Sequence, residues 1–484
     1  MLSKMKRMLS LLLSAILLVL PALAFSGCCA KEENENSSYS KETTEYYTQQ
    51  EEEQTPFDNI SFDGEVFPIT MPLSATDEFC RDSQRTSLSE GLLARATAVE
   101  KKLDIRLQAD PINSGGNALA IRFLNDPPQG ITVLPNIAAE LAVNGYFHNL
   151  NALERVDVDN PWYNRAFMQA TDVNGYCPFA AGEMTPSLWE NATVVLANAN
   201  LLAAGEIADL ADAVVGGKWT YELLMQIATR HCCEINGKAV FGLGNSSGSV
   251  PAMLVSGGFR LVRREPGAGM QFAGFGDETA HSVYRTLRKL WSTPELMPGL
   301  HAGGEAVFAD AGEVFLITRL SCAEGTVGAA GISLQYLPVP KQTEEDTVYR
   351  TTPDRWSMLT VPYNLKSDRL WRTSTVLEAL GYYSEKVGLR EQSLAFFLNL
   401  AGTENISDRT LPLCLADTAF SFGQVYNEAL GRPLSVVADL LITENDRTAA
   451  NRIGMNASVY SNKLSVLCDK LSRYPNRPLT ESNG

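Results

Sequence analysis

Short β-rich runs alternate with helical segments along most of this chain, and this alternation is what most constrains its fold. Apolar residues recur every three or four positions from Leu88 to Leu103, which predicts a helix with one buried face after a capping box at Ser87–Glu90. Helices are also expected at 370–383, from Asn136 to Gly145, after a cap at Thr220, and generally from 389 onward. The expected strands are 105–107, 131–134, 193–196, 314–317 and 358–361. The order predicts an α/β fold.

The length of the body limits the domain organisation. About 430 of the 484 residues follow position 56, which is too many for one compact core and suits two lobes. No repeat of fixed period is present. We therefore expect two α/β lobes rather than a repeat array.

The N-terminus has the pattern of an export signal. Lys4, Lys6 and Arg7 precede an apolar run at 11–20, which is shorter than the roughly 20 residues that a membrane span needs. Phe25-Ser26-Gly27-Cys28 then resembles a bacterial lipoprotein lipobox. We expect cleavage of residues 1–27 and lipidation of Cys28, with acyl chains such as palmitate. An ordinary cleaved signal, or a cut at Cys29, is the alternative.

An acidic spacer follows the signal. Residues 30–56 contain eight Glu against two Lys and no Leu, Ile, Val or Phe, so 28–56 is expected to be a disordered tether. The whole chain carries a formal charge of −16, which argues against nucleic-acid partners and favours a soluble monomer. We expect a body outside the cell, held to the extracellular face of the membrane by the lipid anchor.

The nine cysteines do not form a recognisable framework. Most are widely spaced in apolar or mixed sequence, so we expect buried thiols rather than disulfides. His231-Cys232-Cys233-Glu234 has no second cluster to complete a zinc site, and 157–160 lacks the glycine and distal glutamate of a calcium loop. No metal or cofactor is predicted.

A series of short motifs spans nearly the whole body of the chain. The most specific motif is Gly217-Lys218-Trp219-Thr220 at a helix start. The other motifs, in chain order, are at 95–102, 160–163, 174–175, 182–183, 193–198, 241–243, 337–341, 356–362 and 422–427. In this order the motifs resemble those of the extracellular solute-binding proteins of ABC importers, particularly sugar-binding lipoproteins.

The resemblance implies a two-lobed, periplasmic-binding-protein-like fold of type II with three hinge crossovers. The crossings would fall near 191–195, 313–315 and 356–359. Lobe 1 would comprise 57–191 and 316–357, and lobe 2 would comprise 192–315 and 358–484. The implied function is delivery of a small molecule, and of a carbohydrate in particular, to the permease subunits of an ABC importer.

Candidate ligand contacts lie next to these crossings, where side chains of both lobes face a cleft. Aromatic faces suit the C–H side of a sugar ring, and planar polar groups suit its hydroxyls. Trp162 and Trp219 are expected to pack in the core instead. The candidates beside the crossings are Trp356, Trp189, Glu190, Asn191 and Glu313, and Asn136, which follows the expected strand at 131–134, is added to them.

Two other functional classes remain open. Gly244-Asn245-Ser246-Ser247-Gly248 matches the nucleophile elbow of serine hydrolases, but only His281 and His301 follow it, neither in a recognisable loop motif. We therefore expect a protein that is not an enzyme. A surface lipoprotein without a small ligand, such as an adhesin or a degenerate scaffold, is the second alternative, since Leu196-Ala197-Asn198-Ala199 departs from the resembled pattern.

Overall fold

The computed structural model describes residues 54–79, 88–112, 116–246, 248–265, 269–293, 296, 304–401 and 406–474. The chain divides into two compact units after Asp58. Of the first unit the structure describes 54–58, a turn in which the Thr55 hydroxyl donates to Asp58 Oδ1 at 2.9 Å. The predicted signal peptide, Cys28 and nearly all of the expected tether lie outside the described residues.

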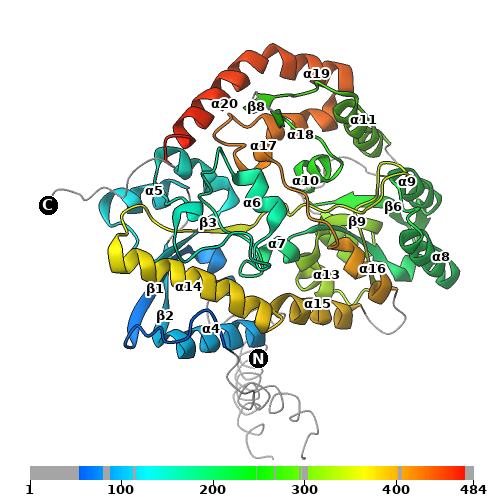
Figure 1. Ribbon diagram of the computed structural model, residues 1–484. Coiled ribbons are helices and arrows are strands. Elements are labelled where there is room, and N and C mark those ends of the chain that lie inside the picture. Colours follow the sequence, from blue (N-terminus) through cyan, green and yellow to red (C-terminus); the bar gives the residue numbers. More distant parts are fainter. Residues whose placement is uncertain are drawn as a thin grey trace, which may run out of the picture. The chain divides into compact units, whose positions relative to one another are not determined.

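Within the second unit, lobe 1 is organised around a four-stranded sheet in the order β11-β3-β1-β2. Strand β1 (Glu65–Pro72) pairs in parallel with β2 (Ile105–Ile112) and β3 (Ile131–Pro135), and β11 (Ser357–Thr360) pairs antiparallel with β3. The first four residues of β3 and all of β11 are buried, which is typical of strands covered on both faces. The longest helix of this lobe, α14 (Ser367–Lys386), packs along α4 (Ser89–Leu103), as Figure 1 shows. The other helices of lobe 1 are η2 (Leu73–Ala75), α3 (Thr76–Phe79), α5 (Gly116–Asn125), η3 (Asn136–Asn144), η4 (Leu150–Ala152), α6 (Arg165–Thr171) and α7 (Ser187–Glu190).

Lobe 2 contains a five-stranded sheet in the order β10-β4-β9-β6-β5. Its strands are β4 (Thr193–Asn198), β5 (Cys233–Ile235), β6 (Lys238–Asn245), β9 (Glu313–Arg319) and β10 (Leu334–Leu337). Only the β6–β9 pair is parallel. A separate hairpin is formed by β7 (Val262–Glu265) and β8 (Gly269–Phe272).

The helices of lobe 2 come from the middle and the end of the chain, as the continuous colours of Figure 1 show. The last helix, α20 (Ala457–Leu471), contacts both β8 and η3. The others are η5 (Ala199–Leu201), α8 (Ala204–Val215), α9 (Tyr221–Arg230), α10 (Ser249–Ser256), α11 (Glu278–Ser292), α12 (Gly304–Ala309), η6 (Leu320–Ala323), α13 (Thr326–Ala329), α16 (Ser407–Cys414), α17 (Phe422–Val425), α18 (Pro433–Thr443) and α19 (Asp446–Met455).

Three segments carry the chain between the lobes, so the expectation of a two-lobed α/β fold with three crossovers is confirmed. The first lies at 191–193 before β4 and the second at 351–356 before β11; both fall at or beside predicted positions. The third is α15 (Leu389–Leu400), which packs on α14 and α4 at one end and on α16 at the other.

The predicted crossing at 313–315 and the lobe boundaries drawn from it are wrong. Strand β9 lies entirely in the lobe 2 sheet between β4 and β6, and β10 pairs with β4 in the same sheet. Residues 316–337 therefore belong to lobe 2, and β11 and α14 belong to lobe 1. An apolar strand pattern indicates burial but does not indicate which sheet a strand joins, and this explains the error.

Most of the predicted elements are present. The five expected strands correspond to β2, β3, β4, β9 and β11, and the apolar stripe of α4 is buried from Leu88 to Leu103. Thr220 caps α9 by accepting from the Leu223 N–H at 3.3 Å. The segment after Asn136 forms a 3-10 helix, which ends at Gly145 with φ of +73°. Ser87 of the expected capping box lies outside the described residues, and the described helix α4 begins at Ser89 after Leu88.

Two of the motifs that suggested the family pack against each other. The Trp219 indole donates to the Pro338 carbonyl at 2.8 Å, and the Lys341 N–H donates to the Trp219 carbonyl at 3.1 Å. The buried Lys341 ammonium is held by the carbonyls of Glu344 and Asp346 and lies 5.5 Å from the ring centre of Tyr349. Trp219 is fully buried, as expected for a core residue.

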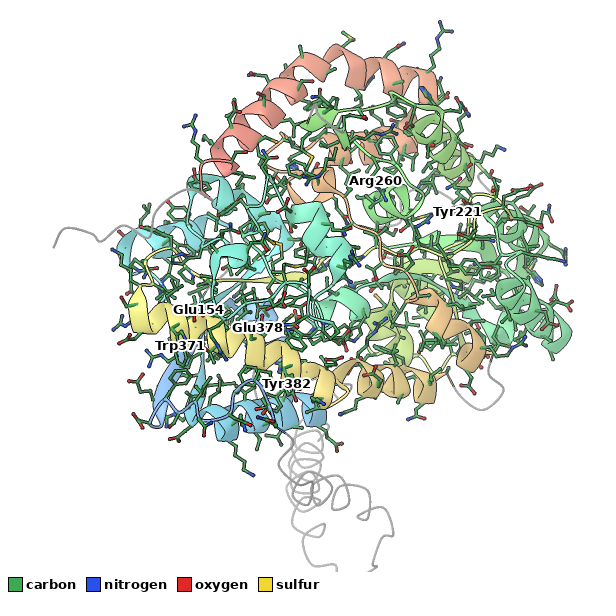
Figure 2. The ribbon with its side chains drawn as sticks, viewed as in Figure 1. Glu154, Tyr221, Arg260, Trp371, Glu378 and Tyr382 are labelled. Carbon is green, nitrogen blue, oxygen red and sulfur yellow. The ribbon has the colours of Figure 1, made fainter. Side chains whose placement is uncertain are left out.

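In lobe 1, the Asn160–Tyr163 motif is held by a buried carboxylate on α14. Glu378, labelled in Figure 2, lies on α14. Its carboxylate accepts from the Tyr163 hydroxyl at 2.6 Å, from the Trp162 indole at 3.2 Å and from the Asn160 amide at 3.2 Å. Trp162 is buried, again as expected. The carboxylate ties the motif to the helix that covers the sheet.

Candidate functional site

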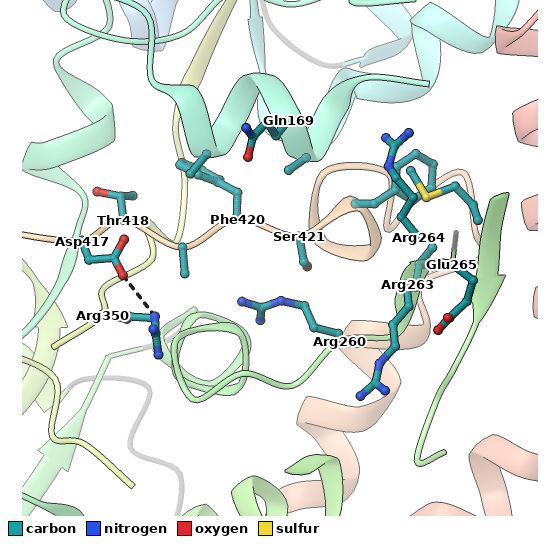
Figure 3. Close-up of a pocket in the computed structure, with 16 residues that line it drawn as sticks. Gln169, Arg260, Arg263, Arg264, Glu265, Arg350, Asp417, Thr418, Phe420 and Ser421 are labelled. Atoms are coloured by element: carbon teal, nitrogen blue, oxygen red, sulfur yellow. Dashed lines mark hydrogen bonds and ion pairs between the residues drawn. The ribbon is translucent and has the colours of Figure 1, made fainter. Parts of the chain in front are cut away.

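A cavity of about 550 Å³ lies between the two lobes, close to the crossing segments (Figure 3). Helix α6 of lobe 1 forms one wall, and Arg260 with the β7–β8 hairpin of lobe 2 forms the opposite wall. The segment 417–422 and Arg350 complete the lining. The volume falls within the range of about 300–1,000 Å³ that is usual for small-molecule sites.

The floor of this cleft is part of the hinge. Residues 191–193 and 351–354 run side by side, with a bridge between Ala192 and Pro353 and a bond from the Thr193 hydroxyl to the Thr352 carbonyl at 2.8 Å. Segment 417–419 lies along the same ribbon, since the Ala419 N–H donates to the Thr351 carbonyl at 2.7 Å. A ligand resting on 417–422 would therefore contact the region about which the lobes can move.

Aromatic side chains form the apolar part of the lining. Phe420 and Phe422 face the cavity, and Phe420 meets Phe167 and Trp356 edge to face at centroid distances of 5.3 and 5.4 Å. Trp356 itself is 3% exposed and does not line the cavity. The structure thus places Trp356 behind Phe420, where it supports the ring that a ligand would touch.

The polar part of the lining is rich in arginine. Arg260, Arg263, Arg264 and Arg350 line the cavity together with Glu265 and Asp417. The amide of Gln169 projects from α6, and Ser421 lies opposite it (Figure 3). Aromatic rings with planar donors and acceptors are the groups that a polar, ring-shaped ligand requires.

A smaller cavity of about 210 Å³ adjoins the cleft at Thr418, which lines both. Trp189 lines this second cavity, and its indole N–H has no hydrogen-bond partner among the described residues. Glu183 and Arg390 also line it, with 3.7 Å between the carboxylate and the guanidinium, and burial raises the pKa of Glu183 to about 7. Ligand contact by Trp189 stays a prediction that this position allows.

Glu190, Asn191 and Asn136 hold the crossings together instead of lining either cavity. Glu190 is fully buried and accepts from the Ser393 hydroxyl of α15 at 2.8 Å. Asn191 accepts from the Ser321 hydroxyl at 2.9 Å. The Asn136 N–H donates to the carbonyl of Trp356 at 3.1 Å. The side chains of these three residues are not part of the lining of either cavity.

Glu313 is placed away from the cleft, and the expectation that it faces a ligand there is wrong. It is fully buried at the start of β9, beneath Gly244 of β6, where an added Cβ would lie 1.9 Å from Glu313 Oε2. Side chains alternate along a strand, so Glu313 shares the face of Phe315, which packs against Trp219. Burial raises the pKa of its carboxyl to about 8.

The described residues show no assembled hydrolase site. The Ser246 hydroxyl is buried without a hydrogen-bond partner, whereas His281 lies against Asp446, with 3.5 Å from Nδ1 to Oδ2. His301 lies outside the described residues. Ser246 instead belongs to the turn before α10, where its carbonyl accepts from the Ser249 hydroxyl at 2.7 Å.

Across the described ranges there is no group of three His, Cys, Asp or Glu side chains that could hold a metal ion. The six cysteines in those ranges are free thiols, and Cys177, Cys322 and Cys414 are buried as expected. No helix within the described part of the chain is both long and apolar enough to cross a bilayer.

The cleft residues that the sequence did not reveal come from three distant segments. Gln169, Arg260 and Phe420 have no common motif, and their segments meet only because the lobes fold back on the hinge. One signal was present: the Phe422–Asn427 motif directly follows the segment that lines the cleft. Tracing outward from that motif would have pointed to Phe420.

No protein-family model and no curated sequence matches this chain. Solved structures match its fold, at 11–14% identity among those compared below. The galacto-N-biose/lacto-N-biose I-binding protein of the ABC transporter from Bifidobacterium longum, in complex with lacto-N-biose, has a TM-score of 0.54 and 11% identity, covering 85% of this chain and 98% of that one. A cyclo/maltodextrin-binding protein with maltotetraose has a TM-score of 0.53 and 12% identity, covering 87% and 99%. The GacH receptor of Streptomyces glaucescens, studied unliganded and with acarbose, has a TM-score of 0.52 and 14% identity, covering 84% and 99%. The chain therefore has the two-lobed fold of sugar-binding proteins of ABC transporters.

Proposed function

We propose that this protein is a solute-binding receptor that takes a carbohydrate into the cleft between its lobes. The observation that carries the proposal is the cleft itself: the largely buried rings of Phe420 and Phe422 form its apolar lining, and Gln169 and the arginines offer planar hydrogen-bonding groups, beside the hinge segments 191–193 and 351–354. No comparably organised catalytic group faces this cavity among the described residues. Binding without turnover is the function that such a lining supports.

The fold adds independent support. The structural neighbours were solved with lacto-N-biose, maltotetraose or acarbose, and the alignment with each of them covers 84–87% of this chain. In a two-lobed protein with a hinge at the cleft floor, a ligand that contacts both walls favours the closed arrangement. Closure would enclose the sugar and create the surface that a permease recognises.

Membrane attachment and delivery to an ABC importer complete the proposal. They are supported by the signal-like N-terminus, by the lipobox-like tetrapeptide ending at Cys28, and by the acidic spacer after it. A lipidated Cys28 would keep the receptor at the extracellular face of the membrane. Mass spectrometry of the N-terminal peptide should find acyl chains on Cys28, and an unmodified N-terminus at Cys29 or later would refute this part.

A thermal-shift screen tests the binding function. A ligand that binds only the folded state at a hundredfold excess over Kd raises the free energy of unfolding by about 2.7 kcal/mol, enough to raise Tm by a few degrees. The library should contain neutral and acidic saccharides, amino acids, peptides and polyamines. We expect Tm to rise with one or more saccharides and not with the amino acids, peptides or polyamines.

The control is Arg409→Gln, which removes an exposed arginine paired with Asp212 on the surface of lobe 2 and should leave the shift unchanged. A rise in Tm only with peptides or amines would support a solute-binding receptor whose ligand is not a saccharide. No shift with any compound would favour a surface lipoprotein without a small ligand.

A further inference from the structure

The charge of the cleft is opposite to that of the protein. Four arginines and two acidic residues line the cavity, in a chain whose formal charge is −16. Whether this lining attracts an anion depends on which of the four guanidinium groups are balanced by carboxylates within the protein.

Three of the four arginines are already paired with carboxylates. Arg350 Nε lies 3.1 Å from Asp417 Oδ2, and Arg263 forms an ion pair with Asp277. Arg264 reaches across to lobe 1, where it donates to the Asp172 carbonyl at 2.7 Å and lies 3.7 Å from its carboxylate. Their charges are therefore partly balanced within the protein.

Arg260 differs from the other three. Its Nη1 donates to two peptide carbonyls, of Val255 at 2.6 Å and of Phe259 at 3.0 Å, and no described carboxylate lies within 4 Å of its guanidinium. No described residue accepts from its Nε or Nη2. The carbonyls fix one edge of the guanidinium, while the other edge retains its donors.

The surroundings of Arg260 favour an anionic hydrogen-bond acceptor over a neutral one. Burial first, and then the nearby charges of Arg350 and Arg263, lower the pKa of Arg260 to about 10, so it remains charged at neutral pH. Figure 3 shows its side chain extending from the loop after α10 toward the segment that carries Ser421. A half-buried guanidinium with like charges beside it is stabilised by an oxyanion more than by hydroxyl groups.

We propose that the ligand of this cleft is an acidic saccharide, and that its carboxylate, sulfate or phosphate pairs with the free edge of Arg260. The inference rests on the proposed function and specifies its substrate class. Phe420 and Gln169 would contact the sugar, and Arg260 would hydrogen-bond its anionic group. A planar oxyanion can accept two parallel N–H bonds from a guanidinium, which a single hydroxyl cannot.

Calorimetric titration of the full-length protein tests this assignment. Oligogalacturonate, a sulfated disaccharide and a hexose phosphate are compared with the matching neutral saccharides and with inorganic phosphate alone. We expect one acidic saccharide to bind about tenfold or more tightly than its neutral counterpart, because a charge-assisted bond is stronger than a neutral one. Its affinity should fall as salt is raised.

Substitution of Arg260 provides the second arm. Arg260→Gln should weaken binding of the acidic saccharide about tenfold or more and binding of its neutral counterpart by much less, so that the preference for the acidic compound is lost. Arg260→Lys keeps the charge but not the planar pair of donors, and its affinity for the acidic saccharide should be intermediate. Arg409→Gln is the matched control and should change neither. Circular dichroism and Tm of each variant confirm that folding is retained.

The outcomes separate the two proposals. Equal affinity for acidic and neutral saccharides, or an unchanged preference in Arg260→Gln, would overturn the acidic ligand while leaving the sugar receptor in place. Inorganic phosphate binding as tightly as any saccharide would identify an anion site and overturn the saccharide part. Binding of none of these compounds would defeat the receptor function as well.

Discussion

The carboxyl group of Glu313 should make the stability of this protein depend on pH, and its replacement by glutamine should remove that dependence. Glu313 is fully buried beneath Gly244, and neither oxygen has a hydrogen-bond partner among the described residues. Burial alone raises the pKa of this group from 4.5 to about 8. The folded protein therefore holds Glu313 protonated at neutral pH.

The sign of the effect follows from proton binding. Between pH 4.5 and 8 the unfolded chain releases this proton and the folded chain keeps it, so the contribution of Glu313 is most favourable at low pH and is lost as pH rises. One proton of difference lowers the free energy of unfolding by about 1.4 kcal/mol per pH unit, or roughly 4 kcal/mol between pH 5 and 8. Glutamine is nearly the same size and does not titrate.

Urea unfolding of the wild type and of Glu313→Gln at pH 5, 6, 7 and 8, at constant ionic strength, measures this contribution. The free energy of unfolding of the variant relative to the wild type should rise by about 1.4 kcal/mol per pH unit. Glu234→Gln removes an exposed carboxylate from the edge strand of the same sheet and should run parallel to the wild type. Parallel curves for Glu313→Gln would show that the buried carboxyl is ionised or solvated and would refute the reasoning.

Three further predictions concern local geometry. Thr220→Ala removes the N-cap of α9 and should lower the free energy of unfolding by about 1 kcal/mol in urea titration, whereas Thr220→Ser should preserve most of it. Gly182→Ala would place a Cβ 1.9 Å from the Trp162 carbonyl; because the obstacle is backbone, Tm should fall by several degrees, and an unchanged Tm would contradict the close approach. Gln169→Ala should weaken saccharide binding about two- to tenfold in calorimetry without changing the Tm of the free protein, since this side chain is exposed and lines the cleft; an unchanged affinity would remove it from the site.

The fold was largely predictable because its elements are locally encoded. The stripe from Leu88 to Leu103, the cap at Thr220 and the glycine after the 136–144 helix each specify one element through nearby residues. The motifs at 217–220 and 337–341 were informative for a physical reason that the structure reveals: they hydrogen-bond to each other. The two motifs lie more than a hundred residues apart in the sequence, and the fold brings them into contact.

The assignment of strands to lobes could not be predicted in the same way. β10 and β11 are both fully buried and four residues long, yet one pairs with β4 and the other with β3. Pairing partners depend on the path of the whole chain. As a consequence, a crossing was predicted at 313–315, where β9 lies within the lobe 2 sheet, and the crossing through α15 was missed.

The sequence placed most of its candidate ligand contacts beside the crossings, and of these Trp189 lines a cavity described above. Trp356 lies at a crossing as expected, but its ring is directed into the core behind Phe420. Arg260 lies in a loop about ninety residues before the hinge segment at 351–354. Most arginines in loops are solvated, so nothing in the sequence places this one in a cleft. Only the folded arrangement shows that, among the described residues, no carboxylate lies within 4 Å of the Arg260 guanidinium.

Hydrogen exchange can show whether one ligand contacts both lobes at the cleft. The full-length protein is compared with and without saturating saccharide identified in the thermal-shift screen. We predict increased protection in peptides covering 165–171 of lobe 1, 260–265 of lobe 2 and 417–422 at the hinge. Protection confined to one lobe, or located on a surface remote from these three segments, would contradict the account.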